Sequence, residues 1–334
     1  MTIRVAINGM GRIGRCIARA LIDRSDRYPD IALVAANSPG APDAQLHLLK
    51  YDSVHGRLRS DVAYENGAFR YDGGEIALYH ERNPLALPWN DLNVDVLLEC
   101  SGKFNSRKEA GTHLDAGAKK VIISAPANDA DMTVVYGVNH DAYDKKTMRV
   151  VSAASCTTNC LAPLAKILHE RFVVVAGHMT TVHSYTGDQN LVDATHKDLR
   201  RARAAGASII PTSTGAAKAI GLVLPELEGK LHGASLRVPT PNVSMVDFTF
   251  ASEKPLSRGD ILAALKAAVP MGGALAVCEE PLVSVDFNGS EASCTVDATS
   301  IACPSPHLGR VAAWYDNEWG FSLRMLDLVR HVCA

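Results

Sequence analysis

Short apolar runs alternate with amphipathic stretches over the first 150 residues of the chain. Four of these runs are β-rich and bounded by turn residues, at positions 3–7, 32–36, 94–99 and 121–124. Between them, apolar residues recur at helical spacing, for example over 12–22 and 106–116. Strands that alternate with helices in this way predict a Rossmann-type, doubly wound parallel sheet with crossover helices.

The second half of the chain has longer runs in which apolar and polar residues alternate. These runs cover 173–184, 234–238, 244–251 and 282–286, and helical patterns recur at 215–222, 257–268 and 322–332. Such alternation is typical of a mostly antiparallel sheet with one covered face. We therefore expect an α/β chain with a Rossmann-type domain over 1–155 and an α+β domain over 156–320. The segment 321–334 is expected to form a helix that packs back on the first domain.

Composition and charge narrow the functional classes. With 334 residues the chain suits two domains, and its formal net charge of −2 gives no general reason to expect nucleic acid or an anionic membrane as partner. No apolar run approaches the roughly 18 to 20 residues that span a bilayer. The first residues enter a strand at once, which leaves no room for a signal peptide. Eight scattered cysteines then favour reduced thiols and a cytoplasmic location.

The run Ser155-Cys-Thr-Thr-Asn-Cys160 carries the most distinctive chemistry. It follows an apolar stretch at 148–154, which indicates a buried strand, and precedes an amphipathic helical pattern. Cys156 is therefore expected at a helix N-terminus, where the helix dipole and unpaired N–H groups favour the nucleophilic thiolate. The polar residues 157–159 could cap the helix or hold an anion. Cys160 is expected to be a structural thiol, since no His/Cys cluster completes a metal site around it.

A glycine-rich turn joins the first strand to the first helix, with the sequence Gly9-Met-Gly11-Arg12-Ile13-Gly14. The order strand, glycines, helix and second strand favours dinucleotide binding over an ordinary turn. The glycines permit a tight turn, close approach to a pyrophosphate and close helix packing. Ser101 and Ser124, near the ends of later strands, are further candidate cofactor contacts.

The end of the second strand bears on which dinucleotide binds. An acid that holds the adenosine ribose is expected there, but the chain reads Ala36-Asn37-Ser38-Pro39. Ser38 cannot repel a 2′-phosphate, and its hydroxyl could donate to one. Asn37 or a backbone carbonyl could equally hold the ribose of NAD, so these residues alone leave NAD and NADP about even.

A cysteine that attacks an aldehyde needs a base. His183 is the candidate because its β-rich run precedes the polar loop 185–190, and pairing with Cys156 would lower the thiol pKa. Three segments indicate anion sites: the basic run 196–203, the hydroxyl-rich helix start 212–218, and Arg237 inside a strand, where a charge needs a partner. Two phosphate subsites would explain all three.

With these residues assembled, the chain resembles the phosphorylating glyceraldehyde-3-phosphate dehydrogenases over its whole length. The matching stretches are 8–15, 48–53, 154–163, 183–203, 211–219, 237–246 and 314–320. The resemblance implies a homotetramer that uses glyceraldehyde 3-phosphate, inorganic phosphate and NAD or NADP, and that forms 1,3-bisphosphoglycerate reversibly.

The resemblance also implies a role for each matching residue. Cys156 would form a thiohemiacetal and then an acyl-thioester, with His183 as the base. Asn317 would hold the nicotinamide carboxamide, and the loop 184–207 would reach a neighbouring subunit's cofactor. The residues implied around the substrate phosphate are Thr186, Asp188 and Arg237, and those around the attacking phosphate are Ser155, Thr157, Arg201, Thr214 and Gly215.

Departures from the family's NAD-specific pattern favour NADP, or use of both cofactors. Those members usually carry Asp where this chain has Ser38, and Leu-Pro where it has Ala194-Thr195. Small and hydroxyl residues at both places resemble photosynthetic and biosynthetic members that accept NADP. Arg82 could supply a positive partner for the 2′-phosphate, and Thr195 a second contact.

Two other functions stay open. Erythrose-4-phosphate dehydrogenase uses a related cysteine site, but the segments 185–186 and 213–218 favour phosphorolysis of a triose substrate. A non-catalytic binding protein on the same scaffold, such as an RNA-binding or adhesive one, gains no support from the near-neutral charge.

Overall fold

A computed structural model describes residues 2–127, 129–269 and 271–334 of the chain. The described chain forms two compact units. Unit 1 consists of Met1–Val134, His140–Ala154 and Ser322–Ala334, and unit 2 of Val135–Asn139 and Ser155–Phe321. The sequence placed its divisions at 155/156 and 320/321, and did not anticipate that Val135–Asn139 belongs to unit 2.

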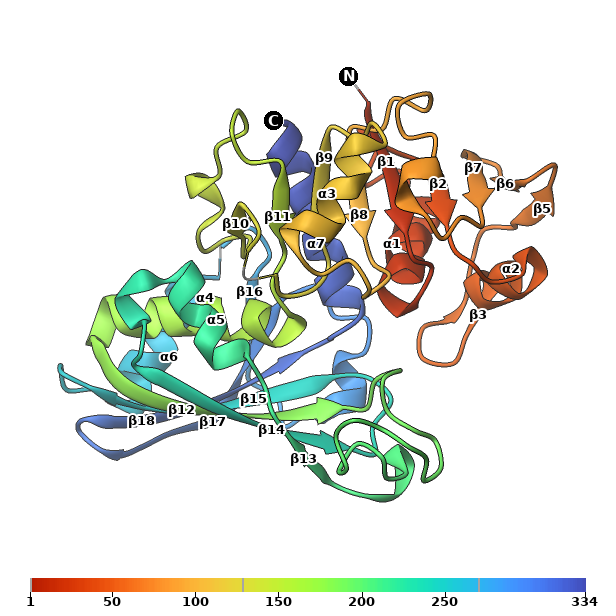
Figure 1. The fold of residues 1–334 in the computed structure, drawn as a ribbon. Helices are drawn as coiled ribbons and strands as arrows, with labels where there is room; N and C mark the ends of the chain where they lie inside the picture. The colour runs from red at the N-terminus through yellow and green to blue at the C-terminus, as the bar shows by residue number, and fades with distance from the viewer. Residues whose placement is uncertain (1, 128, 270) are drawn as a thin grey trace. The chain divides into compact units, whose positions relative to one another are not determined.

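Unit 1 is built on a nine-stranded sheet of order β10-β11-β9-β8-β1-β2-β7-β6-β5 (Figure 1). Its pairs are parallel except for β5–β6 and β6–β7. The strands are β1 Ile3–Asn8, β2 Ile31–Asn37, β5 Ala63–Glu65, β6 Ala68–Tyr71, β7 Gly74–Tyr79, β8 Val96–Glu99, β9 Lys120–Ile123, β10 Met132–Thr133 and β11 Val150–Ser152. A separate ribbon pairs β3 Tyr51–Asp52 with β4 Gly56–Arg57. The helices are α1 Arg12–Asp23, α2 Pro42–Lys50, α3 Arg107–Asp115 and most of α7 Trp319–Cys333, with short 3₁₀ turns η1 Pro84–Ala86 and η2 His140–Ala142.

Burial along the central strands explains why they form a parallel sheet. Every residue of β8 is buried, as are the last four of β1, so neither strand has a wet face. Leu97 and Val121 join a core cluster with Trp89 and Ala110 of α3. The Rossmann-type prediction for this part of the chain is confirmed.

Unit 2 is built on a seven-stranded sheet of order β13-β14-β12-β15-β18-β17-β16. Only β12–β14 and β16–β17 pair in parallel. The strands are β12 Val174–Ser184, β13 Ile210–Thr212, β14 Leu231–Val238, β15 Ser244–Ser252, β16 Leu275–Cys278, β17 Cys294–Ser305 and β18 Leu308–Tyr315. The helices α4 Cys156–Phe172, α5 Ala216–Val223 and α6 Arg258–Ala267 lie on one face of this sheet (Figure 1). The 3₁₀ turns are η3 Ala205–Ala207, η4 Pro225–Leu227 and η5 Ser284–Phe287.

One covered face produces the alternation seen in the sequence. Along β15, buried and half-buried residues strictly alternate. The prediction of a mostly antiparallel second sheet is confirmed. Within residues 2–127, 129–269 and 271–334, no helix is long and apolar enough to cross a membrane.

Two predicted strands differ in the structure. Residues 282–286 do not form a strand, because the Asp286 carboxylate accepts the Val283 N–H and Asp286 N–H bonds the Val283 carbonyl, which closes the turn η5. The alternating valines there, Val283 and Val285, are 59% and 71% exposed, so they bury too little surface to hold a strand. The strand expected at 148–154 ends at Ser152, and Ala154 adopts a left-handed backbone with φ of 59°.

Candidate active site

The turn that delivers Cys156 is short and tightly bonded. Ala154 N–H donates to the Ser152 hydroxyl over 3.0 Å, and α4 begins two residues later at Cys156. Ser155 caps the helix, since its hydroxyl accepts the Thr158 N–H at 3.1 Å. The cap is therefore Ser155 and not a residue of the run 157–159, and the nucleophile candidate occupies the first helical position, as expected.

Cys156 and His183 lie next to each other in unit 2. The Cys156 Sγ is 3.6 Å from Nε2 of His183, which lies near the end of β12. The other ring nitrogen, Nδ1, is 2.7 Å from the Ser184 carbonyl oxygen. Because a carbonyl can only accept, Nδ1 carries the proton, and the lone pair of Nε2 faces the thiol. This is the geometry of a base poised to take the thiol proton.

Burial sets the charge state of this pair. It raises the pKa of the Cys156 thiol, against the opposing effects of the Arg237 charge and of bonds from Thr157. Burial and the same Arg237 charge lower the pKa of His183 to about 4. At neutral pH the pair is a thiol beside a neutral imidazole. The thiol pKa is raised and not lowered as expected, because burial outweighs the Arg237 charge and the helix N–H groups that favour the thiolate. The lone pair of His183 Nε2 is then available to accept the thiol proton.

Arg237 is the half-buried cation that the sequence predicted inside a strand. It faces His183 across the β12–β14 pair. Its Nη1 donates to the Thr186 hydroxyl at 2.6 Å and to the Ser184 carbonyl at 3.3 Å. Its buried Nε has no hydrogen-bond partner among residues 2–127, 129–269 and 271–334. A guanidinium with a buried, unused donor favours an anion.

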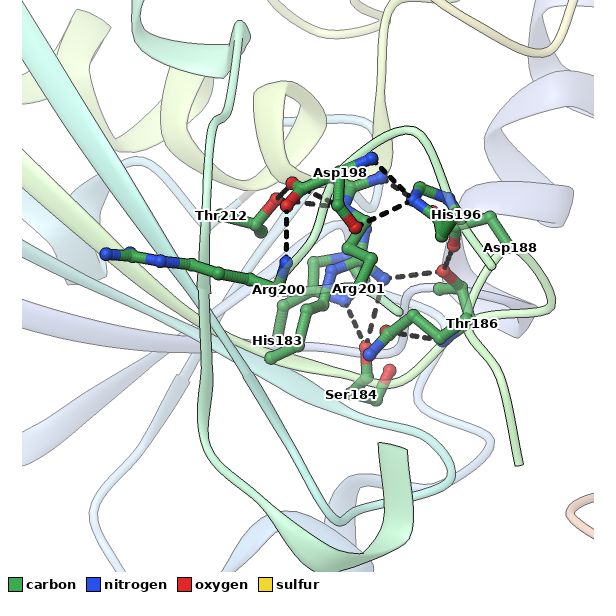
Figure 2. A network of polar contacts seen from close by, with 11 residues as sticks. His183, Ser184, Thr186, Asp188, His196, Asp198, Arg200, Arg201 and Thr212 are labelled. Carbon is green, nitrogen blue, oxygen red and sulfur yellow. Dashed lines mark hydrogen bonds and ion pairs between the residues drawn. The ribbon is translucent and has the colours of Figure 1, made fainter. Parts of the chain in front are cut away.

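A second arginine lies in the same polar network, which Figure 2 shows. Arg201 Nη1 donates to the Asp188 carboxylate at 2.6 Å, and its Nε donates to the Thr212 hydroxyl at 2.8 Å. Asp188 in turn accepts the Thr186 hydroxyl. The structure thus joins Thr186, Asp188, Arg201 and Arg237, which the sequence had assigned to two phosphate subsites.

The remaining phosphate candidates lie at helix starts. Gly215 is the N-cap residue of α5 and offers no side-chain cap, while the Thr214 hydroxyl accepts the Ala216 N–H at 3.2 Å. Thr157 is buried and its hydroxyl lies 2.8 Å from the Tyr315 hydroxyl, which the sequence did not anticipate. Only a non-local contact reveals Tyr315, so no local pattern could have found it.

Asn317 follows β18 and is almost fully buried, with 6% of its surface exposed. Its Oδ1 lies 2.9 Å from the hydroxyls of Ser184 and Ser244, both of which donate to it. These two donors fix the orientation of the amide and leave Nδ2 as the group that a carboxamide oxygen could meet.

Unit 1 contains a cavity of about 350 Å³ at the carboxyl ends of its central strands. It is lined by Asn8, Gly9, Met10, Gly11, Asn37, Ser38, Pro39, Glu81, Arg82, Pro84, Cys100, Ser101, Lys103 and Phe104. The carboxyl edge of a parallel sheet is where doubly wound folds bind nucleotides. Five sequence candidates, Gly9, Gly11, Asn37, Ser38 and Ser101, therefore line one cavity with Arg82.

Two of the glycines are required by the space around them. Gly9 has φ of 102°, and a Cβ there would collide with the backbone of Ser101. A Cβ on Gly14 would collide with the Gly9 carbonyl, so α1 can approach the first strand only with glycine at this position. The turn therefore has the close approach that dinucleotide binding needs, and the residues present fit such a group.

Four other cofactor candidates lie elsewhere. The Arg12 guanidinium bonds the Asp52 carboxylate at 2.5 and 3.0 Å, and this pairing is a main reason that the pKa of Asp52 is lowered despite burial. Ile13 follows in the first turn of α1, and Ser124 directly follows β9 without lining the cavity. Thr195 lies exposed in a loop of unit 2. The sequence missed Glu81, Lys103 and Phe104 as cavity-lining residues, because only the fold brings them to Ser38.

The fold and these side chains are those of an NAD(P)-dependent oxidoreductase, with a cysteine and a histidine side by side in unit 2. Residues 3–107 match the NAD binding domain of glyceraldehyde 3-phosphate dehydrogenase, and residues 155–317 match its C-terminal domain. The chain belongs to the glyceraldehyde-3-phosphate dehydrogenase family, which confirms the resemblance.

Full-length relatives agree with this assignment. A glyceraldehyde-3-phosphate dehydrogenase from Geobacillus stearothermophilus is 53% identical over 336 residues, covering 100% of this chain and 99% of the relative. The plasmid-borne enzyme of that name from Cupriavidus necator is 54% identical over 330 residues, covering 98% and 97%. Glyceraldehyde-3-phosphate dehydrogenase 2 of Trichormus variabilis is 51% identical over 333 residues, covering 99% and 98%.

Proposed function

We propose that the chain catalyses the reversible, phosphorylating oxidation of glyceraldehyde 3-phosphate to 1,3-bisphosphoglycerate. Cys156 attacks the aldehyde carbon as His183 Nε2 takes the thiol proton, which gives a thiohemiacetal. When bound, the nicotinamide would accept the hydride that the thiohemiacetal loses, and this loss leaves an acyl-thioester on Cys156. Inorganic phosphate then cleaves the acyl-thioester on Cys156. The observation that carries this assignment is the 3.6 Å contact between Sγ and an unprotonated Nε2.

The proposal places two anions around this pair. The substrate phosphate meets Thr186 and Arg237, with Asp188 orienting the Thr186 hydroxyl. The attacking phosphate meets Arg201, Thr214 and the start of α5 at Gly215, with Ser155 and the main chain of Thr157 beside it. The unused Nε of Arg237 supports these positions, as does the start of α5, where the N-cap residue Gly215 has no side chain to cap the helix.

Phosphate dependence tests this function. Turnover of glyceraldehyde 3-phosphate should require inorganic phosphate, and Thr214→Ala should raise the KM for phosphate roughly tenfold, since a hydrogen bond to a charged group contributes about 1.5–3 kcal/mol. The KM for the aldehyde should stay within twofold. Steady-state kinetics at varied phosphate measures both.

Ser213→Ala is the matched control for Thr214→Ala, because Ser213 is the exposed neighbour in the same segment. Turnover without phosphate would contradict the proposed reaction, and an unchanged phosphate titration in Thr214→Ala would move the subsite elsewhere. A higher kcat/KM for erythrose 4-phosphate than for the triose would favour the alternative activity.

We also propose that the cofactor is NADP, or that NADP and NAD are both used. Ser38 and Arg82 line the same cavity, and no described residue hydrogen-bonds the Ser38 hydroxyl. Glu81, the one acid among the described residues that line the cavity, accepts the Arg82 and Asn83 N–H groups at 2.6 and 2.8 Å, both on Oε1. A serine with an arginine close by suits a 2′-phosphate better than a carboxylate would.

Arg82→Ala tests this preference. Losing the guanidinium should raise the KM for NADP about tenfold and change the KM for NAD less than twofold, because only NADP carries the 2′-phosphate. Lys103→Ala, which removes another cation from the same cavity, is the control for general charge loss. A wild-type kcat/KM strongly favouring NAD, or equal effects on both cofactors, would contradict the preference.

The assembly and compartment are part of the same proposal. The loop 184–207 and the residues after it expose large apolar side chains: Leu191 at 87%, Val192 at 70%, Leu199 at 83% and Ile209 at 66%. Exposed apolar residues gathered in one segment favour an interface between subunits. They support the homotetramer, in which Thr195 would face a neighbour's cofactor. A cytoplasmic location rests on the scattered reduced cysteines.

A further inference from the structure

A buried acid and a buried histidine in unit 1 have no part in the chemistry proposed above. Glu99 ends β8 and is 1% exposed, while His113 lies in α3 and is fully buried. The His113 Nε2 is 3.2 Å from Glu99 Oε2, and the indole N–H of Trp89 points at His113 Nδ1 over 3.0 Å. An indole nitrogen can only donate, so Nδ1 accepts and Nε2–H donates to the carboxylate.

The Glu99 carboxylate accepts further bonds. Asn8 Nδ2 donates to Oε2 at 2.5 Å, and the N–H and hydroxyl of Ser101 donate to Oε1 at 2.7 and 2.5 Å. A buried carboxylate is costly unless such donors surround it, and each donor is held in place by it in turn. Glu99 therefore fixes two residues that line the cavity, Asn8 and Ser101.

The network continues across the sheet. Asn8 Oδ1 accepts from Asn37 Nδ2 at 2.7 Å. The same Nδ2 donates to the Glu81 carbonyl at 2.9 Å, and Asn37 Oδ1 accepts the Glu81 N–H at 2.9 Å. These residues end or follow β8, β1, β2 and β7, which are neighbours in that order. A continuous row of polar contacts thus crosses the carboxyl edge of the sheet.

This row reaches the segment that carries the proposed 2′-phosphate partner. Both N–H groups of the Asn37 amide are used internally, on Asn8 and on Glu81. Asn37 therefore holds Glu81 and Arg82 against the strand end and has no N–H left for a ribose. The amide and carboxylate groups of the row bind one another. The side chains of Ser38 and Arg82 line the cavity and remain for a ligand.

We propose that Glu99 and His113 are positioning residues of the dinucleotide site, acting through Asn8 and Asn37 on the Glu81–Arg82 segment. The proposal rests on the NAD(P) use proposed above and not on which cofactor is preferred. The row shapes the cavity for both cofactors, since it orders the backbone around the adenosine end and contacts no 2′-phosphate. The row has no part in the proposed cysteine chemistry.

Trp89→Phe is the sharpest test, because Trp89 is fully buried and does not line the cavity. Phenylalanine keeps a ring but lacks the N–H to His113. We expect the Kd of NAD and of NADP, measured by calorimetry, to rise by the same factor of about three to five. Glu99→Gln should raise both about tenfold or more, because its amide N–H₂ would face donors. In both variants kcat at saturating cofactor should stay within twofold.

The double variant Trp89→Phe/Glu99→Gln should bind no more weakly than Glu99→Gln alone, because the two residues act in one row. Val121→Ala is the control, since Val121 packs in the same core cluster without joining the row. Unchanged Kd values in folded Trp89→Phe and Glu99→Gln, or a Val121→Ala variant with the same loss, would overturn the inference. Arg82→Ala separates a failure of this inference from a failure of the cofactor preference. The substitution leaves the row untouched, and its expected effect on NADP alone tests the preference.

Discussion

Replacing Cys156 by serine is expected to reduce the turnover of glyceraldehyde 3-phosphate by at least about 10³-fold. A hydroxyl is a far weaker acid than a thiol, so the same base at His183 ionises it far less, and a neutral hydroxyl is a poor nucleophile. The measurements are kcat in the oxidative direction and the intact mass of the enzyme after mixing with aldehyde and cofactor. Wild-type enzyme without phosphate should carry an acyl group, and Cys156→Ser should carry none.

Cys303→Ser is the matched control for this substitution. Cys303 lies in β17 of the same unit, is partly buried and has no place in the proposed chemistry. Its kcat should stay within twofold of the wild type. A Cys156→Ser enzyme that retained its activity would remove the enzymatic assignment built on this residue and revive the non-catalytic alternative.

Replacing His183 by asparagine should lower kcat/KM by about 10² to 10⁴-fold, the usual contribution of a general base. Asparagine can still donate towards the Ser184 carbonyl but has no counterpart of Nε2. Because burial raises the pKa of the Cys156 thiol, little thiolate forms at neutral pH without the base. Alkylation of Cys156 by iodoacetamide should therefore slow at pH 7 in His183→Asn and recover only at higher pH.

The lowered pKa of His183 also gives the acid limit of the wild-type enzyme. Nε2 stays an acceptor at neutral pH and is protonated only as the pH falls towards about 4. In the unfolded chain this histidine is protonated from about pH 6.5 downwards. The free energy of unfolding should therefore fall as the pH drops from about 6.5 to about 4, because only the unfolded state binds the proton in that range. His178→Asn, on the same strand but exposed, is the control. Identical alkylation profiles for wild type and His183→Asn would exclude the base role.

Local patterns were enough for the elements that carry the site. The periodicity of the apolar residues predicted β1, α1 and β12 within one or two residues. The reason is that β1 and α1 are buried over most of their length, and that β12 buries every second residue over its second half, at Met179, Thr181 and His183. The glycine turn could also be predicted from the sequence, because the close contact between Gly14 and Gly9 joins residues only five positions apart. The strand predicted at 282–286 was wrong, because its alternating valines are largely exposed.

The sequence by itself therefore determined the two sheet types, the glycine turn and the position of Cys156 at the start of a helix, all of which depend on neighbours within a few residues. Only the tertiary structure decided which groups meet. It paired Cys156 with His183, joined Arg237 to Thr186, and linked Glu99 to His113 and Trp89. It also reversed the expected pKa of the Cys156 thiol, because the exclusion of water depends on every element packed around the sulfur and not on the residues next to it in the chain.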